Sequence, residues 1–133
     1  MYSKILVALD ENQLSRQAFQ HSLSLAQVFD AELMLLNVVS PQEAEWQFVV
    51  ANKLDYLRSL VDEATQAGVA TKLVQEIGQP EQQICESAKD WQADLIVIGS
   101  HGRKGLNELI MGSVSNYVSH HVPCDVLLVH QQV

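Results

Sequence analysis

Hydrophobic residues in this chain alternate between short continuous runs and longer stretches with the spacing of an α-helix. Five short runs are present, the third of them weak, at residues 3–9, 32–39, 70–76, 93–98 and 125–129. A run that is apolar at successive positions is typical of a strand covered on both faces, as in a parallel sheet. The pattern therefore predicts five strands in a parallel arrangement.

Helical stretches separate the predicted strands. One helix is expected between residues 12 and 29, another begins near Glu43, a third follows Pro80, and a fourth covers 114–121. Proline suits the first turn of a helix, and Gly68 is placed to end the second one. The apolar face of that second helix is expected to consist of Val50, Leu54, Leu57, Val61 and Ala64.

Strands and helices alternate from one end of the chain to the other. Right-handed crossovers between parallel strands then give an open α/β sandwich of three layers. The 133 residues contain no linker, repeat or low-complexity segment, so we expect one domain over residues 1–133.

Composition and charge narrow the range of partners. The formal net charge is −8, which repels a phosphate backbone at long range and disfavours general nucleic-acid binding. No apolar run is long enough to span a membrane and no leader follows Met1, so we expect neither a membrane protein nor a secreted one, but a cytoplasmic one. Cys85 and Cys124 form no disulfide pattern and are expected to act as small core residues.

Four of the six glycines lie between residues 97 and 115. Gly99 follows a predicted strand, where bare backbone N–H groups can approach an anion. Gly112 and Ser113 precede a predicted helix, whose first N–H groups are unpaired and favour phosphate. Arg103 lies between these two patches. The alternative is that Gly99 only makes a turn and Ser113 only caps a helix, and the spacing alone leaves both interpretations open.

Several sharper motifs are absent. No glycine precedes a Lys-Ser or Lys-Thr pair as in a Walker loop, and the first strand ends in Asp-Glu-Asn, not in the dinucleotide Gly-x-Gly. The frame Gly-x-Ser-x-Gly of a hydrolase elbow is missing too. Residues 98–103 do match the Ile-Gly-x-x-Gly loop of a KH module, which binds RNA. A KH loop lies between two helices, however, whereas a strand leads into this one.

The longer spacing Gly99-x2-Gly102-x9-Gly112-Ser113 resembles the signature of the nucleotide-binding members of the universal stress protein family. The resemblance extends along the whole chain. It includes K-I-L-V-A-L-D at 4–10, G-Q-P at 78–80, A-D-L-I-V-I-G-S-H-G-R at 93–103 and V-P-C-D-V-L-L-V at 122–129.

The resemblance implies a Rossmann-like fold of the adenine nucleotide alpha hydrolase type, with strand order 3-2-1-4-5 and helices on both faces. It also implies an ATP site in which Asp10 lies near the ribose or base and Val39 packs on the adenine. Asp10 has an alternative explanation as a carboxylate at the start of a helix. The full set of implied binding residues is Ala8, Asp10, Val39, Ile98, Gly99, Gly102, Arg103, Gly112, Ser113, Val114 and Ser115.

The expected function is that of a nucleotide-binding, stress-response regulatory protein. No residue suggests itself as a catalytic base, so ATP hydrolysis is expected to be slow or absent. The alternatives are a protein–protein interaction module with a vestigial pocket and an ATPase or phosphotransferase that depends on a partner. No metal-ligand spacing is present, and Mg²⁺ would arrive with ATP, held mainly by the phosphates. The sequence leaves open whether ATP, ADP or AMP is the resident nucleotide. The family also suggests a homodimer through strand 125–129.

Overall fold

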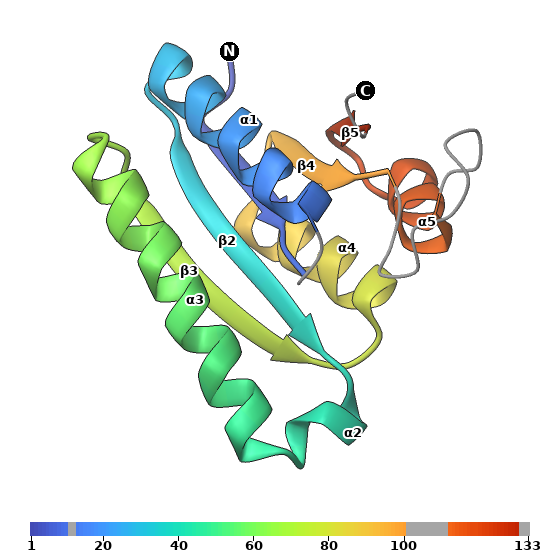
Figure 1. Ribbon diagram of the computed structural model, residues 1–133. Helices are drawn as coiled ribbons and strands as arrows, with labels where there is room; N and C mark the ends of the chain where they lie inside the picture. Colours follow the sequence, from blue (N-terminus) through green and yellow to red (C-terminus); the bar gives the residue numbers. More distant parts are fainter. Residues whose placement is uncertain (11–12, 101–111, 131–133) are drawn as a thin grey trace.

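A parallel sheet lies between two layers of helices in the computed structural model (Figure 1), which describes residues 1–10, 13–100 and 112–130. The strands are β1 (Lys4–Ala8), β2 (Glu32–Val39), β3 (Thr71–Ile77), β4 (Leu95–Gly99) and β5 (Asp125–Val129). The helices are α1 (Gln13–Phe29), α2 (Pro41–Ala44), α3 (Gln47–Gln66), α4 (Pro80–Trp91) and α5 (Ser113–His121).

The sheet has the order β3-β2-β1-β4-β5, and every neighbouring pair of strands is parallel. This confirms both the predicted fold class and the order implied by the resemblance. β1 is central, with β2 on one side and β4 on the other. Val7 of β1 pairs with Leu35 of β2 and with Val97 of β4, so the carboxyl ends of these strands lie at one edge of the sheet.

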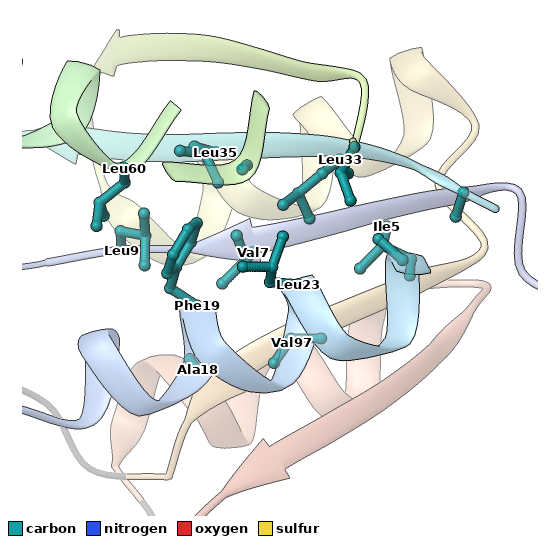
Figure 2. Close-up of a cluster of buried hydrophobic side chains, with 14 of the residues drawn as sticks. Ile5, Val7, Leu9, Ala18, Phe19, Leu23, Leu33, Leu35, Leu60 and Val97 are labelled. Atoms are coloured by element: carbon teal, nitrogen blue, oxygen red, sulfur yellow. The ribbon is translucent and has the colours of Figure 1, made fainter. Parts of the chain in front are cut away.

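One face of the sheet packs against α1 and α3. Phe19 of α1 and Leu60 of α3 are almost fully buried in this layer, where they meet Val7 and Leu35 from the strands (Figure 2). The other face packs against α4 and α5, through residues such as Ile84. Burial on both faces explains why the strands are apolar at successive positions.

The helix predicted to begin near Glu43 is divided in two. Ser40 caps α2 by accepting a hydrogen bond from the Glu43 N–H at 3.1 Å, and Pro41 occupies the first turn. Trp46, with φ −98° and ψ 84°, then leaves the helical conformation before α3 starts. Capping at Ser40 thus begins a helix earlier than the apolar spacing alone predicted.

The buried stripe of α3 is also rotated from the predicted one. Leu57 and Ala64 are buried as expected, but Lys53 and Leu60 complete the stripe, while Val50, Leu54 and Val61 are only half-buried. Lys53 escapes the cost of burying a lone charge because its ammonium donates to Glu43 of α2. No helix within the described ranges has the length and hydropathy needed to cross a membrane.

Candidate functional site

The carboxyl ends of β1 and β4 form the point where the strand order reverses. From β1 the chain proceeds to β2 on one side, whereas β4 lies on the other side and connects outward to β5. Loops that leave such neighbouring strands diverge, and the crevice between them is where open α/β sheets bind their ligands. Both the Asp10 segment and the glycine segment begin at this crevice.

Two hydrogen bonds join the two glycine patches, although thirteen residues separate them in sequence. The Gly112 N–H donates to the Ser100 carbonyl at 2.6 Å, and the Ser115 hydroxyl donates to the Gly99 carbonyl at 2.6 Å. The end of β4 and the start of α5 are therefore in direct contact. Gly102 and Arg103, the other two predicted binding residues of this segment, lie outside the described residues.

α5 presents its amino end at this contact. Gly112 occupies the N-cap position with φ −63° and ψ 153°, and no side chain caps the helix. Ser113 is therefore the first helical residue and not the cap, and its side chain is exposed. The first N–H groups of an uncapped helix carry partial positive charge, so the amino end of α5 suits an anion.

The two buried serines of this region differ in their hydrogen bonding. Ser115 is 2% exposed, and its only hydroxyl proton is donated to Gly99, so this side chain fastens α5 to β4. Ser100 is fully buried, and its Oγ has no hydrogen-bond partner. An unsatisfied buried hydroxyl is costly, and it marks this position as one where a ligand atom could supply the missing bond.

On the β1 side, Asp10 is oriented by a serine of α1. The Asp10 N–H donates to Ser15 Oγ at 2.7 Å, and Ser15 Oγ donates to Asp10 Oδ1 at 2.7 Å. The bond to Ser15 also agrees with the alternative explanation of Asp10, as a carboxylate at the start of a helix. Asp10 is half-buried and lies just beyond the carboxyl end of β1.

The remaining predicted residues are at the ends of the strands. Ala8 ends β1, and Ile98 is buried in β4 next to Gly99. Val39 ends β2 but is only 1% exposed, and its carbonyl accepts from the Gly78 N–H at 2.9 Å. The side chain of Val39 is therefore almost inaccessible to solvent.

Buried polar residues concentrate at the same end of the molecule. Six are buried in the described part of the chain, and only Ser22, which bonds within α1, is distant from the carboxyl ends of the strands. The other five are Ser15, Asn37, Lys53, Ser100 and Ser115. Sequence reasoning missed Ser15, Asn37 and Lys53, although Asn37 could have been noticed because it interrupts the apolar run of β2.

The cysteines offer no reactive group for this site. Burial, and then the nearby Glu81, raise the pKa of the Cys85 thiol, and burial followed by Asp125 raises the pKa of the Cys124 thiol. A raised pKa leaves less thiolate at neutral pH, so both thiols are poor nucleophiles. No cluster of metal-binding side chains occurs among residues 1–10, 13–100 and 112–130.

Residues 1–130 match the model of the universal stress protein family. The chain belongs to this family. Universal stress protein Sll1388 of Synechocystis is 33% identical, over 96% of this chain and 97% of its own. The solved structure of UspA from Lactobacillus plantarum has a TM-score of 0.87 at 27% identity, covering 97% of this chain and 98% of that one.

A further relative was solved in complex with cAMP. This universal stress protein has a TM-score of 0.79 at 25% identity, and the alignment covers 98% of this chain and 99% of that one. The similarity to both solved structures therefore extends over nearly the whole of each chain.

The hydrogen bond from the Ser115 hydroxyl to the Gly99 carbonyl is expected to stabilise the fold. We expect Ser115→Ala to lower the free energy of unfolding by about 1–3 kcal/mol, because the Gly99 carbonyl loses its donor in a buried position. Urea denaturation followed by circular dichroism measures the change. Ser119→Ala, on the same helix, is the matched control, since Ser119 bonds only within α5, to Asn116 and His120, and is more exposed. Equal stabilities of the two variants would show that Ser115 does not fasten α5 to β4.

Proposed function

We propose that this universal stress protein binds an adenine nucleotide, with ATP as the favoured ligand, in the crevice at the carboxyl ends of β1 and β4. The observation that carries the proposal is the hydrogen bond between Gly112 and Ser100, which makes one continuous backbone surface from two glycine patches. The relative solved with cAMP supports an adenine nucleotide as the ligand class.

The residues present fit the phosphate part of such a ligand. The backbone N–H groups of Ser113 and Val114 are at the uncapped amino end of α5, where a phosphate is favoured, while the Gly112 N–H is donated to Ser100. Gly99 leaves room for close approach, and the buried Ser100 Oγ lacks a partner. The sequence signature adds Gly102 and Arg103 to this phosphate side.

The adenosine part would face β1 and β2. Asp10 is fixed by its hydrogen bond with Ser15 and carries the acceptor oxygens that a ribose hydroxyl or an adenine amino group requires. Ala8, Val39 and Ile98 would complete the apolar wall. Mg²⁺, where present, would be held mainly by the phosphates of the nucleotide.

A regulatory role fits these residues better than rapid catalysis. Phosphoryl transfer needs a group that positions the attacking water, and no residue of the sequence suggests itself for that role. We therefore propose slow turnover of ATP or none.

An interaction module with a vestigial pocket is the competing function. The two are distinguished by mass spectrometry of small molecules released from the purified protein, since only a working pocket retains nucleotide.

Gly102→Val tests the phosphate side. We expect this variant to lose ATP binding, by at least roughly 100-fold, because a branched side chain blocks the path of the phosphates along a backbone that must be bare. Isothermal titration calorimetry measures the affinity. Asn107→Val, inside the same connector but outside the signature, serves as the control and is expected to bind like the wild type. Unchanged affinity of Gly102→Val would contradict the assignment.

We also propose a homodimer that forms through β5. This strand ends the sheet, so one of its sides has no neighbouring strand within the described residues, and unpaired strand edges readily pair with a second copy. Static light scattering at micromolar concentration is expected to give twice the chain mass of 14.8 kDa. A mass of one chain would overturn the dimer without affecting the nucleotide site.

A further inference from the structure

The peptide group between Leu9 and Asp10 is held on both of its edges by buried side chains. Its carbonyl, on Leu9, accepts a hydrogen bond from Asn37 Nδ2 at 2.9 Å. Its N–H, on Asp10, donates to Ser15 Oγ at 2.7 Å. Asn37 and Ser15 come from β2 and α1, so two different elements fix the orientation of one peptide plane just beyond the end of β1.

Burying the amide of Asn37 at this position costs free energy. Asn37 is 3% exposed in the middle of an otherwise apolar strand, between the leucines of β2 and the α1–α3 layer. A buried amide costs free energy unless its donors and acceptor are bonded. Here the acceptor is satisfied as well, since Gln75 Nε2 donates to Asn37 Oδ1 at 3.1 Å. An apolar residue would fill the same space without needing either bond.

The hydrogen bonds form a chain across three strands. Gln75 pairs in register with Asn37 between β3 and β2, and Asn37 then reaches Leu9 at the end of β1. This series of hydrogen bonds ends at the peptide that carries Asp10. The effect of the Asn37 bond is local, because the Leu9 N–H already connects Leu9 to β2 by donating to the Leu36 carbonyl at 2.8 Å. What Asn37 adds is the orientation of the next peptide plane and hence of the Asp10 carboxylate.

We propose that Asn37 is a positioning residue of the nucleotide site, which acts through Asp10 without contacting the ligand. This inference rests on the proposed function. Without the bond to Asn37, the Leu9–Asp10 peptide loses the restraint on its carbonyl and keeps the Ser15 bond on its N–H, so a smaller fraction of molecules presents the carboxylate correctly. The apparent dissociation constant rises by the reciprocal of that fraction.

A double-mutant cycle tests the proposal. Asn37→Leu keeps the approximate volume but removes both hydrogen bonds, and we expect the dissociation constant for ATP to rise by roughly tenfold. Asp10→Ala is expected to weaken binding at least as much. Because Asn37 acts through Asp10, the double variant should bind no more weakly than Asp10→Ala alone. Calorimetry with ATP measures all four proteins.

Three further variants separate positioning from general destabilisation. Asn37→His can donate to Leu9 and accept from Gln75, so it should recover part of the lost affinity. Gln75→Leu removes only the outer bond and should weaken ATP binding less than Asn37→Leu does, which keeps the test available if Asn37→Leu fails to fold. Ser22→Ala is the control, since Ser22 is equally buried but bonds within α1, and it should bind ATP like the wild type.

The outcomes distinguish this inference from the function on which it rests. If the effects of Asn37→Leu and Asp10→Ala multiply in the double variant, Asn37 does not act through Asp10 and the inference is wrong, although the nucleotide site stands. If the wild type binds no adenine nucleotide, or Asp10→Ala binds it normally, then the proposed site itself fails, and the role of Asn37 fails with it.

Discussion

The parallel pairing of β1 with β4 is the constraint on which the rest of the structure depends. If strands paired only with their neighbours in the sequence, β1 would pair with β2 alone. In the sheet, however, β1 lies between β2 and β4. The segment that carries Asp10 and the segment that begins at Gly99 therefore leave the sheet from the carboxyl ends of two neighbouring strands. The carboxyl ends of neighbouring strands at which the strand order reverses are where open α/β sheets bind their ligands.

The crevice is shaped by buried polar groups as well as by strand order. Gly112 and Ser115 bond to the end of β4, so α5 presents its amino end at a fixed place. On the opposite wall, Ser15 and Asn37 fix the peptide before the Asp10 side chain. These bonds hold the groups in place in the absence of ligand, which reduces the ordering that binding would otherwise require.

The sequence predicts the architecture better than the details of the site. Apolar runs at successive positions predict parallel strands because that pattern depends only on burial on both faces, and the run was weak at β3, where no residue is fully buried. The strand order came from the family resemblance, since periodicity does not encode which strands are neighbours. The roles of Asn37 and Lys53 depend on partners 28 and 10 residues away, Leu9 and Glu43, which no local pattern identifies. Ser115 is one of the binding residues implied by the resemblance, and no local pattern identifies the tertiary hydrogen bond that its hydroxyl donates to Gly99.

Amide hydrogen exchange with and without ATP tests the central claim most directly, because it reports where on the chain a ligand binds. A nucleotide site between β1 and β4 predicts slower exchange at Asp10, at Gly99 and Ser100, and at residues 112–115. No change is expected at Val69, beside the amino ends of the strands. Protection confined to other parts of the chain, or no protection at saturating ATP, would contradict a nucleotide site between β1 and β4.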